Sequence, residues 1–219
     1  MDALNRIKFL EDRLHNLSEI GMALSTEKNT DRLFEMILEE AKKITRADGR
    51  TLYSMNKEGN LQFEILCNDT MDTVMGGTSG VEIPYYPVKL WFDKQTPNRK
   101  NVSAYVALAQ KTVNIDDAYE EEGFDFEGTK NFDKKSGYRS KSFLTVPLQN
   151  HESEIIGVMQ LINARNEHGE VISFNEEMQE QIESLASQGA VALTNKRLVE
   201  ELKTLFEAFI KLIATAIDK

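Results

Sequence analysis

Cysteine, proline, tryptophan and histidine are scarce in this sequence. Of its 219 residues, one is cysteine, four are proline, one is tryptophan and three are histidine. The lone Cys67 has no partner for an internal disulfide, and its place in the apolar run LQFEILC predicts a buried structural thiol. His15, His151 and His168 lie far apart, without the spacing of metal ligands. We therefore expect neither a disulfide scaffold nor a metal site.

Positive charge is also in deficit. The chain has 26 lysines and arginines against 36 aspartates and glutamates, which gives a net charge of −10. A nucleic-acid partner is not expected, because phosphate backbones are bound by basic surfaces. Neither a cationic apolar leader nor a long apolar run is present, so we expect no membrane partner and a cytoplasmic location. The length suits one domain with long appendages, or two small domains.

Both ends of the chain carry heptad patterns, in which apolar residues alternate at steps of four and three. The N-terminal seam comprises Ala3, Ile7, Leu10, Leu14, Leu17, Gly21 and Leu24, and the C-terminal seam Leu198, Leu202, Leu205, Phe209, Leu212 and Ala216. A helix over residues 175–218 would be roughly 65 Å long at about 1.5 Å per residue, which exceeds what a compact sheet domain covers. The terminal helices are therefore expected to lie together and to form a homodimer.

The residues between the seams predict an α+β domain with an antiparallel sheet. Expected helices cover residues 29–48, capped by Asn29 or Thr30, and residues 103–110, capped by Asn101. Expected strands cover residues 50–55, 61–68, 112–115, 142–148 and 155–162, with one short strand more at 88–92 inside a long connection over residues 69–100. These patterns divide the chain into an N-terminal helix (1–25), a domain (26–195) and a C-terminal signalling helix (196–219).

The central stretch, residues 131–164, predicts a β-hairpin with an irregular, charged lead-in loop at residues 133–140. Just before it, residues 116–127 contain seven acidic side chains and no basic one, whereas residues 130–141 contain five basic side chains and one acidic one. Adjacent blocks of opposite charge can hold each other as a lid over the hairpin, although a solvated surface is the simpler alternative. No catalytic arrangement is evident, and we expect a small molecule to bind beside this hairpin.

Several motifs in the right order resemble a GAF domain, over about residues 20–195. They are TVNIDDAY at residues 112–119, FDKKSGYRSKSFLTVPL at 132–148 and IIGVMQLINA at 155–164, and they look like the form found in cyclic-nucleotide phosphodiesterases. FDFEGTKNFDKKSGYRS, VSAYVAL and LFEAFIKLIATAIDK further resemble bacterial proteins in which such a domain precedes an HD-GYP phosphohydrolase. The resemblance implies a sheet of about six strands, with the terminal helices on one face and a ligand pocket on the other.

The same resemblance implies a set of ligand-binding residues. Val102 and Ser103 fall at a helix start that cradles phosphate, Asp133, Ser136 and Ser140 on the loop that reads the base or ribose, and Gln160 on the strand beneath. Backbone amides, hydroxyls and a carboxylate suit a cyclic nucleotide chemically. The chain departs from the nucleotide-binding members at Ala164, where they have Lys, and at Met178 and Gln179, where they have Asp and Glu.

Three functions are open at this point. The first is a sensory domain that binds a small molecule, dimerises through its terminal helices and controls a C-terminal HD-type phosphodiesterase that lies outside this sequence. The second is a dimerisation scaffold without a ligand, whose pocket would be filled by side chains. The third is part of a metal-dependent phosphohydrolase. The sequence contains no His-Asp pair, so we expect no catalytic residue, metal site or cofactor in this chain.

Overall fold

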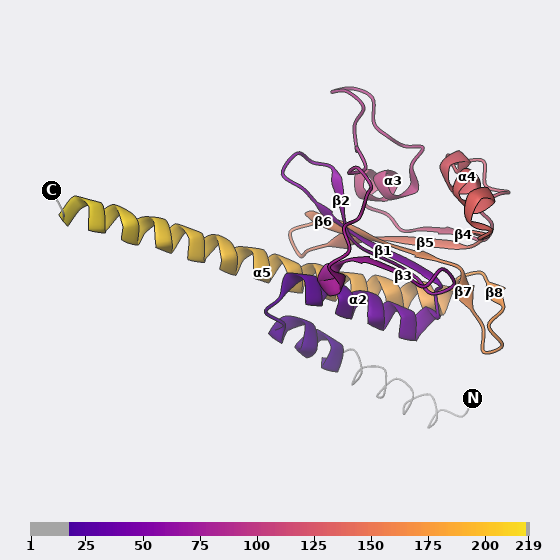
Figure 1. Ribbon diagram of the computed structural model, residues 1–219, viewed down its shortest axis with the longest axis horizontal. Coiled ribbons are helices and arrows are strands. Elements are labelled where there is room, and N and C mark those ends of the chain that lie inside the picture. The colour runs from indigo at the N-terminus through magenta and orange to yellow at the C-terminus, as the bar shows by residue number, and fades with distance from the viewer. Residues whose placement is uncertain (1–17, 218–219) are drawn as a thin grey trace.

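A six-stranded antiparallel sheet forms the centre of the computed structural model, which describes residues 18–217 (Figure 1). Its strand order is β3-β2-β1-β6-β5-β4. The strands are β1 (Gly49–Met55), β2 (Leu61–Asn68), β3 (Thr73–Gly76), β4 (Val113–Ile115), β5 (Phe143–Gln149) and β6 (Ile155–Ile162), and β7 (Ala164–Arg165) pairs separately with β8 (Val171–Ile172). The helices are α2 (Thr30–Thr45), η1 (Gly77–Ser79), α3 (Val102–Ala109), α4 (Glu127–Ser136) and α5 (Glu176–Ile217).

Helices α2 and α5 cover one face of the sheet, as the sequence predicts (Figure 1). Asn29 caps α2 by accepting a hydrogen bond from the Arg32 amide at 3.0 Å, so the predicted start is confirmed. Gly189 of α5 lies against Ile37 of α2, where a Cβ atom would come within 2.8 Å of the isoleucine Cδ1. The two helices therefore approach closely over the main core.

The second half of α5 extends beyond the sheet (Figure 1). Its apolar side chains remain exposed: Leu198, Val199, Leu202, Leu205, Phe206, Phe209, Ile210, Leu212 and Ile213. By contrast, Ile182, Leu185 and Ala186 in the first half are buried. The predicted change of character along this helix is confirmed, because the apolar side chains of the first half are buried on the domain whereas those from Leu198 to Ile213 are exposed.

The opposite face of the sheet carries α3 and α4 and a second apolar core (Figure 1). Asn101 caps α3 as predicted, with its side-chain oxygen accepting from the Ala104 amide at 3.0 Å. The second core consists of Tyr53, Leu61, Leu90, Val102, Ala104, Val106, Ala107, Ile115, Ala118, Phe126, Phe143 and Val158. The sheet thus separates a helical layer from a smaller layer that includes the predicted ligand residues.

Two predictions for the irregular segments are wrong. Residues 133–140 are not simply a loop, because Asp133 and Ser136 belong to α4, which ends at Gly137 in the left-handed conformation (φ 72°). The connection over residues 69–100 contains β3 and η1, while its expected strand at 88–92 is limited to isolated bridges at Val88 and Trp91. In both segments the pattern of apolar residues is weak. Contacts with distant residues, rather than the local sequence, therefore decide which secondary structure forms there.

Most of the predicted N-terminal heptad helix, residues 1–17, lies outside the described residues. Residues 18–26 are helical and run beneath α2 (Figure 1). They contact α5, since a Cβ atom on Gly21 would lie 2.9 Å from the Gln188 side-chain oxygen, and just after them the Lys28 carbonyl accepts from the Lys196 ammonium. The first and last helices therefore lie together within one chain at this point.

Candidate functional site

The start of α3 lies directly on the central strands of the sheet. Ser103 is only 3% exposed, and its Oγ accepts a hydrogen bond from Gln160 Nε2 at 3.3 Å. The same Gln160 nitrogen lies 3.3 Å from Thr145 Oγ1. Two of the residues predicted from the family resemblance, Ser103 and Gln160, are therefore in contact, and the hydrogen bond joins α3 to β6.

The strands on both sides of β6 place further polar side chains in a row with Gln160. Thr51 on β1 and Thr145 on β5 both stand opposite Gln160 on β6. Tyr53, two residues along β1 on the same face, is buried, and burial raises its pKa to about 12 although a hydrogen bond with Ser103 acts in the opposite direction. Three hydroxyls, one amide and one neutral phenol are thus grouped beneath α3 and provide both donors and acceptors.

Asp133 is the centre of a second group, on the inner side of α4. Its side chain is 3% exposed, and its Oδ2 accepts from the Ser140 amide at 2.8 Å and from the Tyr119 hydroxyl at 3.0 Å. Its Oδ1 accepts from Ser140 Oγ at 2.9 Å. We call Asp133, Ser140 and Tyr119 the α4 latch, because these bonds tie the helix to the segments before and after it.

Arg139 reinforces the α4 latch from outside. Its guanidinium carbon lies 3.4 Å from the centroid of the Tyr119 ring, and its Nη2 pairs with Asp117 Oδ1 at 2.7 Å. Lys130 approaches the same ring, with Nζ 5.1 Å from its centroid. The predicted association of the acidic and basic blocks is confirmed for Asp117 and Arg139, whereas the other charged side chains of the two blocks form no ion pair among the described residues.

Asn163 fixes the connection between α4 and β5. It adopts a left-handed backbone conformation (φ 58°) at the end of β6, and its Oδ1 accepts from the Lys141 amide at 2.7 Å. Its Nδ2 donates to the Arg139 carbonyl at 2.7 Å and to the Tyr138 hydroxyl at 3.0 Å. Burial is the main reason that the pKa of Tyr138 is raised, with the Asp48 carboxylate acting in the same direction.

The six residues predicted from the family resemblance thus fall into separate places. Ser103 and Gln160 meet under α3, while Asp133 and Ser140 meet in the α4 latch. Val102 is buried in the second core, and Ser136 is exposed, with its hydroxyl donating to the Phe132 carbonyl at 2.9 Å. Ser103, Gln160, Asp133 and Ser140 therefore each bind another side chain of the chain.

Several members of these groups were not predicted. Thr51 and Thr145 follow from strand alternation once the register with Gln160 is known, but the register itself is not readable from one sequence. Tyr119 was part of a quoted motif without an assigned role. Its approach to Asp133 depends on the helical turn at α4, which the sequence did not predict.

The positions that depart from the nucleotide-binding pattern have structural roles here. Gln179 Oε1 accepts from Asn114 Nδ2 at 3.1 Å, and the same nitrogen donates to the Phe174 carbonyl at 3.0 Å, so β4 is tied to α5 by neutral groups. Ala164 is fully buried in β7. Ala164 is thus held by burial and Gln179 by a hydrogen bond, and neither position contributes an ion pair.

Residues 18–217 contain no group of three or more histidine, cysteine or acidic side chains placed to hold a metal ion. No helix within the same range is long and apolar enough to cross a membrane.

The chain matches the family model of the GAF domain over residues 29–193. It is 38% identical over 104 residues to a dual 3′,5′-cyclic-AMP and -GMP phosphodiesterase 11A of Takifugu rubripes, and 36% identical over 101 residues to a dual phosphodiesterase 11 of Drosophila melanogaster. These matches cover 48% and 46% of this chain. They span only 11% and 6% of the relatives' length, so the chain corresponds to a small part of each.

Solved structures agree on the fold. The GAF domain of a phosphoenolpyruvate-protein phosphotransferase from Acinetobacter superposes with a TM-score of 0.60 at 14% identity, over 86% of this chain and 96% of that one. The corresponding domain from Coxiella burnetii gives a TM-score of 0.61 at 14% identity, with the same coverage. Similarity at this level of identity establishes the architecture and leaves the ligand open.

Proposed function

Because the chain belongs to the GAF domain family, we propose that it is a regulatory module that binds a small molecule, associates with a second copy through α5 and controls an output domain. The relatives' catalysis on cyclic nucleotides supports a signalling context. The match to a GAF model supports a regulatory rather than a catalytic role for this chain. An HD-type phosphodiesterase as the output domain stays a prediction.

One observation carries the proposal: α5 is a single helix of 42 residues that belongs to the domain at one end and leaves it at the other. Leu202, Leu205 and Phe209 stand exposed at heptad spacing on the projecting half. A helix with such a seam is stabilised by a partner helix of the same pattern, and an identical α5 supplies one. A change in how α5 sits on the sheet would then alter how two copies pair.

Ligand binding would occur between α3, α4 and the sheet. The helix start at Ser103 and the polar row at Gln160 provide donors and acceptors, and the α4 latch lies at the rim. A ligand that replaced the hydrogen bonds of the α4 latch would move α4 against β5. A cyclic nucleotide remains the ligand class favoured by the relatives.

A scaffold without a ligand is the second candidate, and a specific observation favours it. Side chains of the second core, including Phe126, Phe143 and Val158, occupy the layer between the sheet and the two helices. Phe126 and Phe143 are in contact, with ring centroids 5.1 Å apart. In a scaffold this core would be permanent, whereas in a sensor it would open on binding. The third possibility, part of a metal-dependent phosphohydrolase, would place catalysis outside this chain.

Self-association is tested by light scattering on the purified chain after size-exclusion chromatography. We expect a dimer for the native sequence and a monomer for Leu205→Asp combined with Phe209→Asp, because two buried carboxylates would disrupt the seam. Lys203→Asp, which adds a carboxylate outside the heptad seam of the same helix, is the matched control and should remain dimeric. A monomeric native chain at micromolar concentration contradicts the pairing of α5.

Ligand binding is tested separately by calorimetry with cyclic AMP, cyclic GMP and cyclic di-GMP. Saturable heat that is lost in Gln160→Ala supports the sensor. If none of the three gives heat and hydrogen exchange in α4 is unchanged by them, the cyclic-nucleotide sensor is excluded and the scaffold is favoured. Neither outcome depends on whether the chain dimerises.

A further inference from the structure

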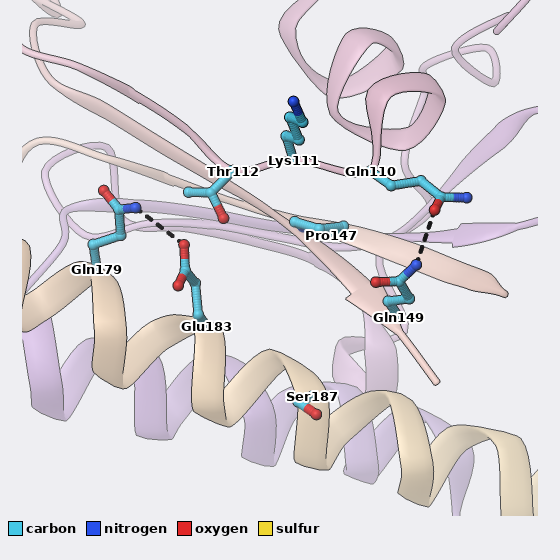
Figure 2. A pocket seen from close by; sticks show the side chains of 8 residues that line it. All are labelled: Gln110, Lys111, Thr112, Pro147, Gln149, Gln179, Glu183 and Ser187. Atoms are coloured by element: carbon cyan, nitrogen blue, oxygen red, sulfur yellow. Dashed lines mark hydrogen bonds between the residues drawn. The ribbon is translucent and has the colours of Figure 1, made fainter. Parts of the chain in front are cut away.

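A concave surface lies at the opposite edge of the sheet from β3, apart from the polar row at Gln160 and from the α4 latch. It is a cleft of about 480 Å³ whose walls come from the end of α3, the start of β4, the strand β5 and the first half of α5. Figure 2 shows Thr112 on one wall, Glu183 on the facing helix and Pro147 between them. None of the predicted ligand residues lines it.

The cleft exists because β4 is shorter than β5. β4 pairs only with Phe143, Leu144 and Thr145, so the outer edge of β5 beyond Thr145 has no strand beside it. The chain preceding β4 turns away through Gln110, which ends α3 in a left-handed conformation (φ 55°). Pro147 lies in this open stretch and lacks an N–H group, which disfavours the addition of a further strand from a partner.

Hydrogen bonds orient some of the side chains around the cleft, at Gln149 and at Glu183. Gln149 Nε2 donates to Gln110 Oε1 at 3.0 Å and to the Ser153 carbonyl at 3.1 Å, so the Gln149 oxygen is left facing the cleft, as Figure 2 shows. On the other side, Gln179 Nε2 donates to Glu183 Oε1 at 3.0 Å, which leaves Glu183 Oε2 as an acceptor. A prearranged set of polar groups reduces the entropy lost on binding.

The charges around the cleft are of both signs. Lys111 lies on the rim, where Figure 2 shows its ammonium directed away from α5, and it forms no ion pair among the described residues, while Glu183 provides a carboxylate on α5. Thr112 and Ser187 add hydroxyls, and no aromatic side chain lines the cleft. This composition disfavours a stacked nucleobase, an apolar molecule and a polyanion. It suits a small molecule that carries one negative and one positive group.

We propose that this cleft binds a free amino acid with a polar side chain. The carboxylate of the amino acid would accept from Thr112 and pair with Lys111 once that side chain turns toward the cleft, and its ammonium would pair with Glu183. The cleft volume is at the small end of ligand pockets, which suits a molecule of this size. Because the cleft joins the α3–β4 connection to α5, its occupant would hold the edge of the sheet against the long helix.

The probe is L-glutamine, titrated into the full chain while amide chemical shifts are followed by NMR. We expect saturable shifts at millimolar ligand in residues 110–112 and 179–187, and none with glutaramate or 4-aminobutanamide, which lack the ammonium or the carboxylate. Glu183→Gln and Lys111→Met should each raise the Kd at least tenfold. Their matched controls, Glu58→Gln and Lys57→Met in the turn between β1 and β2, should leave it unchanged.

Two results would overturn this assignment. One is the absence of saturable shifts with L-glutamine, L-asparagine and L-serine in a protein whose spectrum shows it to be folded. The other is binding that Glu183→Gln and Lys111→Met do not weaken. Both variants change exposed side chains, and thermal denaturation of each will establish that the fold is retained.

Discussion

Replacing Asp133 by alanine is the sharpest test of the α4 latch. The substitution removes one buried acceptor that binds the Ser140 amide, the Ser140 hydroxyl and the Tyr119 hydroxyl. The two hydroxyls can turn toward other acceptors, but the Ser140 amide cannot, and it lies in a residue that is 3% exposed. Since hydrogen bonds to a charged group contribute about 1.5–3 kcal/mol and are not additive, we expect a loss of about 3 kcal/mol in the free energy of unfolding.

Asparagine at the same position should be far less harmful. Its oxygen can accept from the Ser140 amide and the Tyr119 hydroxyl while its NH₂ donates to Ser140 Oγ, so all three contacts survive without the charge. We expect a loss of about 1 kcal/mol for Asp133→Asn. Asparagine has nearly the shape of aspartate and keeps the hydrogen bonds, whereas alanine loses them. The difference in the free energy of unfolding between the two variants therefore reports mainly on the hydrogen bonds.

Urea denaturation followed by far-ultraviolet circular dichroism measures both losses. With a slope of about 2 kcal/mol per molar urea, Asp133→Ala should lower the midpoint by roughly 1.5 M and Asp133→Asn by roughly 0.5 M. Asp93→Ala is the control, because Asp93 also accepts from two backbone amides, at 2.8 and 2.9 Å, but is exposed. If Asp133→Ala lowers the midpoint no more than Asp93→Ala does, the α4 latch does not hold α4 as described.

Three further outcomes are expected. A hydrogen bond from Arg50 lowers the pKa of Asp69 to about 2, so its contribution to stability is present above about pH 4 and is lost as the pH falls through 2; Asp69→Asn should flatten the acid limb of a stability–pH curve. Gly157→Ala should cost several kcal/mol in thermal denaturation, because its Cβ would lie 2.0 Å from a β1 carbonyl oxygen, whereas Gly128→Ala in α4 should be harmless. Burial raises the pKa of the half-buried Cys67 thiol, so alkylation at pH 8 should be slower in the native chain than in urea, and equal rates would contradict this.

The sequence predicted the long periodic elements well. Asn29 and Asn101 identified two helix starts, and the alternation of apolar residues identified the four long strands of the sheet. Cys67 is half-buried rather than fully buried. The expected position of the terminal helices on one face is also confirmed (Figure 1). The helix starts and the long strands depend on local chemistry that a single sequence contains, whereas the placement of the helices on one face was implied by the family resemblance.

The parts that were missed depend on contacts between distant segments. α4 contains Gly128 and few apolar residues, so its helical state follows from Asp133 reaching Ser140 and Tyr119 rather than from propensity. The family resemblance named Ser103 and Gln160 as separate ligand contacts, and it did not indicate that the two side chains would be hydrogen-bonded to each other. The cleft at Pro147 depends on where β4 begins, which is decided by strand register.

The order of the strands has a consequence for how the chain folds. β1 and β6 are neighbours at the centre of the sheet, although they lie roughly a hundred residues apart in the sequence. The hairpins β1–β2 and β5–β6 are local and can form early. The pairing of β1 with β6, which joins the two hairpins, closes a very long loop. During synthesis the two apolar cores therefore stay incomplete until β6 has emerged, and a chain that ends before Ile155 should expose both faces of its sheet.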